Sequence, residues 1–273
     1  MDIMSVLTNF LYQLLLTVGV IVLFGSIIAL CRRLFCRIIG PSGPKILLIT
    51  GFIGTPIHEL SHAIMCLLFG HKITEMKLYQ PNSEDGVLGY VNSSYNPRNL
   101  YHQIGNFFIG VAPIICGSGV LLLLMYFLVP ELFEVVLANF TFDISVDTLD
   151  FSFVGEFFGA LLSTTLAMLS FSNMGNVLWW VFIILAFMIA THMEISPADI
   201  KTGAIGFAYS AVLLLVADFI ISLFSISLLE GVTGVIVGLS AKIVGFLAIS
   251  TVFSLLMVVV AGITKLLGGI FHR

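Results

Sequence analysis

Long apolar runs constrain this chain more than any other feature of its sequence. A helix that crosses a bilayer needs about 20 mostly apolar residues, and about six segments meet or approach that length. They are Val6–Leu30, Ile46–Phe69, Ile104–Val129, Val177–Thr191, Ala204–Leu229 and Ile243–Ile263. Hydrophobic residues make up 59% of the chain and charged residues 10%, whereas soluble domains carry about 25% charged residues. We therefore expect an all-α polytopic membrane protein with about six transmembrane helices, folded as a single domain over residues 1–273.

For two further stretches, the sequence alone does not decide between a position in the membrane and one in water. Val154–Phe171 is long enough to cross but is rich in Gly, Ser and Thr, so a full span and a re-entrant segment both stay open. Gly231–Ala241 is too short to cross. The first run, Val6–Leu30, is too long for the apolar part of a signal peptide and is expected to be a retained helix.

The largest polar interval, from His71 to His102, has the pattern of a β-hairpin. A turn-forming cluster at Pro81–Gly86 separates the segment beginning at Lys72 from the strand-like Val87–Val91. We expect this small hairpin directly after the second transmembrane helix.

Lys and Arg placement predicts an orientation, because cytoplasmic loops of membrane proteins are enriched in basic residues. No basic residue lies between Arg98 and Lys201, which predicts an extracytoplasmic interval at Pro130–Ser152 and a cytoplasmic hairpin. If Val154–Phe171 re-enters, the same orientation places a second group inside: Lys201, Lys265 and Arg273. It leaves a basic cluster outside: Arg32, Arg33, Arg37 and Lys45. The composition shows no basic stripe that would predict a nucleic-acid partner.

One motif inside the second apolar run indicates chemistry. His58-Glu59-Leu60-Ser61-His62 places three ionisable side chains where such groups are costly, and intramembrane ionisable residues usually mark functional sites. On a helix His58 and His62 project from one face and can bind one Zn²⁺. Glu59 can then take a proton from water on the metal. The alternative is a chance motif whose two histidines satisfy each other in a helical core, and the zinc site is the stronger prediction.

A hydrolytic zinc site usually has three protein ligands and one open position. The candidates outside the motif are His71, His102, His192, Glu194, Asp199 and Asp218. Asp199 has the best context, because Ser196 resembles a helix N-cap and Pro197 suits the first helical turn, which would direct Asp199 into the bundle. Asp199 could instead only favour the helix N-terminus electrostatically. His192 stays open as an alternative ligand or as a partner of a ligand.

These residues resemble the site-2 protease family of intramembrane zinc metalloproteases, in particular its small bacterial branch. The resemblance rests on the His58–His62 motif within a span, the hairpin after it, Ala112-Pro113 in the next span, and Asp199 at a later helix start. It implies His58, His62 and Asp199 as zinc ligands, Glu59 as the catalytic base, and six helices with the active site nearer the cytoplasmic face. It also implies a multi-pass protein of a bacterial cell membrane that acts in regulated intramembrane proteolysis.

The expected function is therefore zinc-dependent hydrolysis of a peptide bond in a transmembrane protein substrate within the lipid bilayer. The hairpin, Lys72–Val91, could hold the unwound substrate as an added strand or could pack as a lid against the helices. Two other classes stay open: a membrane zinc hydrolase acting on lipid or prenylated substrates, and a non-catalytic metal-binding regulator or transporter. Glu59 argues against pure transport, since a transport site needs no general base.

Overall fold

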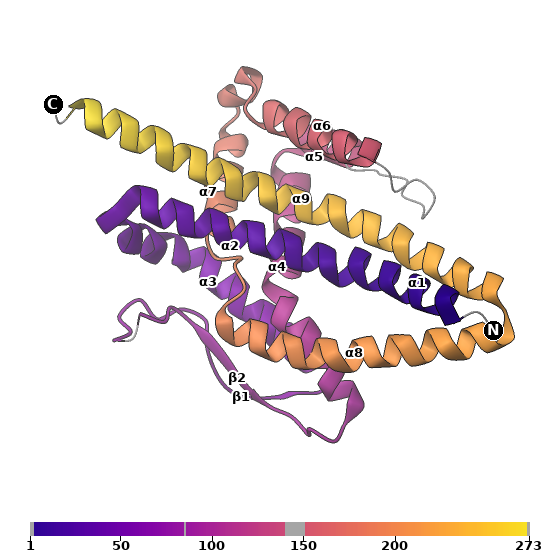
Figure 1. The fold of residues 1–273 in the computed structure, drawn as a ribbon. Helices are drawn as coiled ribbons and strands as arrows, with labels where there is room; N and C mark the ends of the chain where they lie inside the picture. Colours follow the sequence, from indigo (N-terminus) through magenta and orange to yellow (C-terminus); the bar gives the residue numbers. More distant parts are fainter. Residues whose placement is uncertain (1–2, 85, 140–150, 272–273) are drawn as a thin grey trace.

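The computed structural model describes residues 3–84, 86–139 and 151–271 as a helical protein with one small sheet (Figure 1). The helices are α1 (Ile3–Leu14), α2 (Val20–Ile39), α3 (Gly43–Leu68), α4 (Leu100–Leu128), α5 (Pro130–Asn139), α6 (Phe151–Met168), α7 (Val177–Ala190), α8 (Pro197–Phe224) and α9 (Ile226–Phe271). A π-helical turn, Leu15–Gly19, joins α1 to α2 without a break, and short 3-10 turns at Gly40–Ser42 and Phe171–Gly175 precede α3 and α7.

Four helical segments are long and apolar enough to cross a membrane. They are Ile3–Leu68, Leu100–Leu128, Pro197–Phe224 and Ile226–Leu266. Their large apolar side chains are widely exposed, as expected where lipid replaces water. These segments are consistent with a multi-pass membrane protein.

The predicted count of six spans is not confirmed. Two expected spans fall in Ile3–Leu68, where the chain turns at Gly40–Ser42, with Gly40 at φ 65°. α7 has only 14 apolar residues, fewer than a bilayer requires. Gly231–Ala241, expected to be a separate short stretch, belongs to the continuous 46-residue helix α9. Val154–Phe171 largely forms α6, which lies against α5 (Figure 1).

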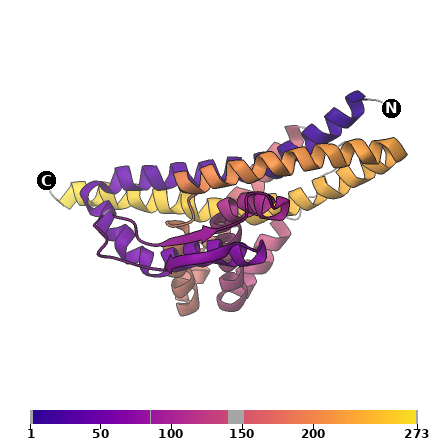
Figure 2. The ribbon, with the colours of Figure 1, turned by 90° about the horizontal axis from the view of Figure 1, so that it is seen from below.

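The long helices run beside one another, and α4 and α7 cross them at a steep angle (Figures 1 and 2). α1 and α2 lie along α9 in the same direction, so that Gln13 donates to Thr233 (2.8 Å) near one end while Phe35 packs in a cluster with Met257 near the other. α8 runs back along them. The largest apolar core lies where α4, α7 and α9 meet, around Ile114, Phe182 and Leu247.

Glycines set the approach of α8 to α4. A Cβ added to Gly206 would overlap the backbone of Phe107, and one added to Gly110 would lie 2.6 Å from the carbonyl oxygen of Asp199 and 2.7 Å from Cα of Gly203. Real Cβ atoms do not approach this closely, so these positions require glycine. Because of this close contact, the first turn of α8, which carries Asp199, lies close to His58 and His62 of α3.

The predicted hairpin is confirmed, with its second strand a little further along the chain than expected. β1 (Lys72–Lys77) pairs antiparallel with β2 (Tyr90–Ser94), from Lys72 opposite Ser94 to Lys77 opposite Tyr90, with an irregularity between Ile73 and Glu75. The connecting loop passes over α3, where the Tyr79 hydroxyl donates to the carbonyl of Leu48 (2.6 Å).

The predicted orientation disagrees with the arrangement of the basic residues. It placed Lys265 on the opposite side of the membrane from the basic cluster of Arg32–Lys45, yet Lys265 lines one cavity together with Ile39 and Ser42. The reason is that α2 and α9 run in parallel and their C-terminal ends coincide. The predicted orientation assumed that each apolar run crosses the membrane once, and that assumption does not place Lys265 beside Ser42.

Candidate metal centre

The H-E-x-x-H motif lies within α3, as predicted. His58 and His62 are one helical turn apart on the same face, and their ring centroids lie 4.9 Å from each other. His62 and Glu59 are buried and His58 is partly buried, so all three face the protein and not the lipid.

Main-chain carbonyls fix the orientation of both imidazoles. Nδ1 of His58 lies 2.7 Å from the carbonyl oxygen of His192, and Nδ1 of His62 lies 2.8 Å from that of Ile109. A carbonyl oxygen only accepts hydrogen bonds, so each Nδ1 carries the proton and donates it. Each Nε2 is then an unprotonated acceptor with its lone pair free for a metal, which is the usual arrangement of metal-binding histidines.

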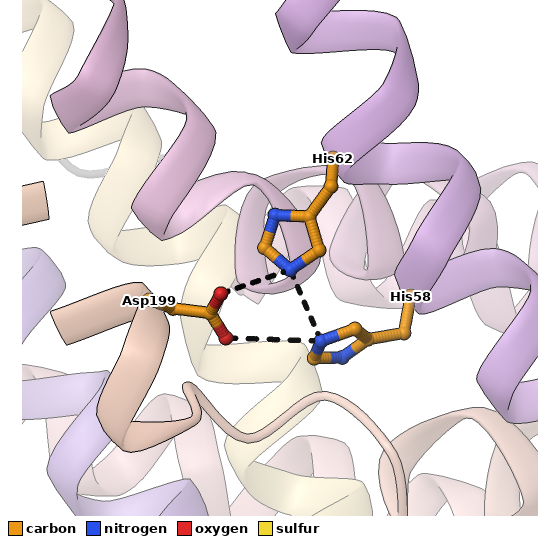
Figure 3. A group of neighbouring side chains, drawn as sticks. All are labelled: His58, His62 and Asp199. Atoms are coloured by element: carbon orange, nitrogen blue, oxygen red, sulfur yellow. Dashed lines mark hydrogen bonds and ion pairs between the residues drawn. The ribbon is translucent and has the colours of Figure 1, made fainter. Parts of the chain in front are cut away.

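Asp199 approaches the two Nε2 atoms from α8 (Figure 3). Its Oδ1 lies 3.3 Å from Nε2 of His62, and its Oδ2 lies 3.9 Å from Nε2 of His58. The predicted N-cap is confirmed: the Ser196 hydroxyl accepts the main-chain N–H of Asp199 (3.2 Å), and Asp199 Oδ2 accepts that of Ser196 (2.9 Å). The carboxylate therefore both closes the capping box and faces the histidines.

The three side chains fit a zinc ion. Their ligand atoms all lie within 4.8 Å of one another. The two Nε2 atoms are only 3.2 Å apart, and while both imidazoles are neutral and donate through Nδ1, neither can donate to the other or to Asp199. Three converging acceptors of this kind repel one another unless a metal ion or a proton lies between them. Two imidazoles and one carboxylate are a common ligand set for catalytic zinc, with a fourth position left open.

Glu59 lies where two cavities meet. One, of about 430 Å³, lies toward Arg32 and His192, and the other, of about 560 Å³, runs along β2 to Asn106 and Asp199. His58 and Glu59 line both cavities. An extended ligand that occupied both cavities would therefore pass directly over the metal centre.

Gly89 brings the hairpin close to this point, and nothing in the sequence pattern identified it. A Cβ on Gly89 would lie 2.8 Å from Cγ of Glu59 and 2.7 Å from Cγ2 of Thr55, so any larger residue would collide with α3. Its place between the turn cluster and β2 is a weak signal, because glycine in such positions usually only shapes a loop.

His192 lies beside the group of three and contacts His58 without joining the group. Besides the carbonyl bonded to His58, its ring lies between two threonines of α3, with Nε2 3.0 Å from Oγ1 of Thr50 and Nδ1 3.4 Å from Oγ1 of Thr55. Burial, together with the neighbouring Arg32 and His58, lowers the pKa of His192 to about 3. The neutral ring thus fixes the linker between α7 and α8 against α3.

The structure does not bring the other ligand candidates to the centre. His71 donates through Nε2 to the carbonyl of His102 (2.9 Å), beside the hairpin. Glu194 forms an ion pair with Arg32. Asp218 is buried at the far end of α8, where it accepts from Gln13 (3.2 Å).

Similarity to known proteins covers the part of the chain that contains the motif. No curated protein and no solved structure matches the chain significantly. A family model matches residues 51–158, a region that begins within α3, includes the motif, the hairpin, α4 and α5, and ends before Asp199. That model is described as "Putative zincin peptidase", and the match supports a zinc metallopeptidase.

Proposed function

We propose that this protein is an intramembrane zinc metalloprotease of the site-2 type, which hydrolyses a peptide bond in transmembrane protein substrates. The observation that carries the proposal is the convergence of His58, His62 and Asp199 beside a buried Glu59, on helices long and apolar enough to cross a membrane. The family match supports the peptidase chemistry, and the position of the motif within an apolar helix supports its membrane setting.

The residues around the site have separable roles. A zinc ion held by His58, His62 and Asp199 would polarise the scissile carbonyl and make nearby water more acidic. Glu59 takes a proton from the attacking water and delivers it to the leaving amine, as a general base and then a general acid. The carbonyls of His192 and Ile109 keep both imidazoles in the orientation that this chemistry requires.

The cavity along β2 supports an extended peptide as the substrate. β2 pairs on one side with β1, and its residues from Tyr90 to Ser93 line the cavity that contains Glu59 and Asp199. An unwound transmembrane segment exposes main-chain N–H and C=O groups, and the free edge of a strand can pair with them. This pairing would hold the scissile bond over the metal centre.

The experiment compares membranes of cells that express the wild type, Glu59→Gln, or Glu131→Gln as a control. Glu131 is an exposed carboxylate in the first turn of α5. We expect one or more membrane proteins to accumulate uncut with Glu59→Gln and to be cleaved with the wild type and the control. Identical protein profiles in all three, with changes confined to the lipid extract, would instead favour the hydrolase that acts on lipid or prenylated substrates.

A further inference from the structure

A third cavity, whose lining shares no residue with the two at the metal centre, has an amphiphilic lining. Its volume is about 400 Å³, within the range of small-molecule sites. It lies where the ends of α2 and α9 meet the beginning of α3, and its walls include Phe35, Ile46 and Phe187. Three polar residues also line it: Ser42, Thr264 and Lys265.

Positive charge gathers at the end of the molecule that holds this cavity. Lys265 lines the cavity, and the exposed Lys45 lies next to the lining residue Ile46 at the start of α3. Arg33 and Arg37, one helical turn apart, lie on the opposite face of α2 from the lining residues Phe35 and Ile39. These four cations lie at the end of the molecule where α2 and α9 finish (Figure 1).

No carboxylate balances these cations within the described part of the chain. Arg32 is paired with Glu194, but no ion pair is formed by Arg33, Arg37, Lys45 or Lys265 among residues 3–84, 86–139 and 151–271. The segments that surround the cavity, residues 31–47, 177–190 and 255–266, contain no Asp or Glu. A ligand of this site must therefore supply the negative charge itself.

We infer that this cavity binds an anionic phospholipid, with an acyl chain among the apolar walls and the phosphate at Lys265. A ligand with an apolar body and an anionic head matches both halves of the lining, and basic pockets between transmembrane helices are known to hold such headgroups. A free anion would leave the apolar walls without a contact, and a lipid without net charge would leave the cations without a counter-charge. The inference does not depend on the proposed function.

The test measures the apparent affinity of the detergent-purified full-length protein for phosphatidylglycerol through the rise in its thermal unfolding midpoint. Phosphatidylcholine and inorganic phosphate serve as comparison ligands. The variants are Lys45→Gln/Lys265→Gln, which removes charge, and Val260→Trp, which places a larger side chain in the exposed wall of the cavity. Lys242→Gln is the control, because Lys242 is an exposed lysine on the same helix but outside the cavity lining.

Phosphatidylglycerol should stabilise the wild type and Lys242→Gln far more than phosphatidylcholine does. The double variant should bind roughly thirtyfold more weakly, since each cation contributes about 1 kcal/mol and about 1.4 kcal/mol is tenfold. Val260→Trp should weaken binding while it keeps every charge. Equal stabilisation by inorganic phosphate, equal stabilisation by phosphatidylcholine, or unchanged binding in a double variant that unfolds at the wild-type temperature without lipid would each overturn the inference.

Discussion

Asp199 and Ser196 cap each other at the start of α8, and the capping oxygen of Asp199, Oδ2, is also the one nearest His58. The helix N-terminus thus holds the carboxylate in place before any metal arrives. A ligand held in advance loses less conformational freedom on binding than a mobile one.

Ser196→Ala should therefore weaken zinc binding although Ser196 is not a predicted ligand. Loss of the cap costs about 1 kcal/mol of stability, and loss of an oriented hydrogen bond behind a ligand typically lowers metal affinity by roughly tenfold or more. Competition with a chromophoric chelator measures the affinity. The control is Ser225→Ala, because Ser225 accepts the N–H of Leu228 at the start of α9, remote from the centre. Equal zinc affinity in both variants would show that the capping box does not position Asp199.

Purified protein should contain about one zinc per chain, because one group of three ligands leaves a single open tetrahedral position. His58→Ala and His62→Ala should each empty the site, and Asp199→Ala should weaken it strongly. Elemental analysis after size-exclusion chromatography checks the content. Full zinc in a His58→Ala/His62→Ala protein would refute the assignment.

Glu59→Gln should retain zinc and the fold but lose hydrolysis by about 10²–10⁴-fold, the usual contribution of a general acid–base residue. The amide has nearly the same shape as the carboxylate but does not accept a proton at neutral pH. Turnover of an identified substrate and metal content, both measured on the same preparation, separate this result from misfolding. Near-normal turnover would assign Glu59 a structural role.

Gly206→Ala should destabilise the protein by about 1–3 kcal/mol, the cost of overpacking a close contact, and should lower zinc affinity because α8 carries Asp199. Gly234→Ala is the matched control, since no heavy atom outside its own helix turn lies within 4 Å of a Cβ there, and alanine favours a helix. Thermal unfolding and zinc titration of both variants test the contact. A Gly206→Ala protein as stable as the control would mean that α8 can move away without loss.

Asp218 offers a test of the ligand choice within the same helix. It is 1% exposed, its Oδ2 and the Oε1 of Gln13 have no hydrogen-bond partner, and its Oδ1 accepts from Gln13. Asp218→Asn removes a buried charge and adds a donor next to Gln13, whose Oε1 is unpaired, so stability should be kept or improved and zinc retained. Asp218→Ala should cost about 1–3 kcal/mol through unpaired buried polar groups. Loss of zinc in Asp218→Asn would return Asp218 to the ligand candidates.

The sequence predicted the grouping of His58, His62 and Asp199 better than the architecture around it. The spacing of His58 and His62 and the Ser196-Pro197 helix start are local patterns, and local geometry was enough to select the residues that the structure brings together. The contacts that the carbonyls of His192 and Ile109 make could not be predicted. Every residue has a main-chain carbonyl, so the amino-acid type does not show which one will accept a hydrogen bond from a histidine. The close approach of Gly89 to Glu59 depends on contacts between distant segments, which a single sequence does not reveal.

The helix count failed for a different reason. Apolar length reports whether a segment tolerates lipid, not where a helix begins or ends. α7 is shorter than a bilayer is thick, and α9 continues through Gly231–Ala241, where the sequence had suggested a break. Helix ends depend on caps and on packing partners, and along α9 the parallel packing of α1 and α2 supplies those partners.

The length of α9 also defines a scale across the molecule. Lys242 and Lys265 are both exposed on this helix, and 23 residues at about 1.5 Å each separate them by about 35 Å, close to the roughly 30 Å thickness of a bilayer's hydrocarbon core. Long cationic side chains favour the two water-facing boundaries of that core. A bilayer that spans this part of α9 would therefore have one lysine near each of its two boundaries, so the spacing of the two side chains matches α9 to the thickness of a membrane.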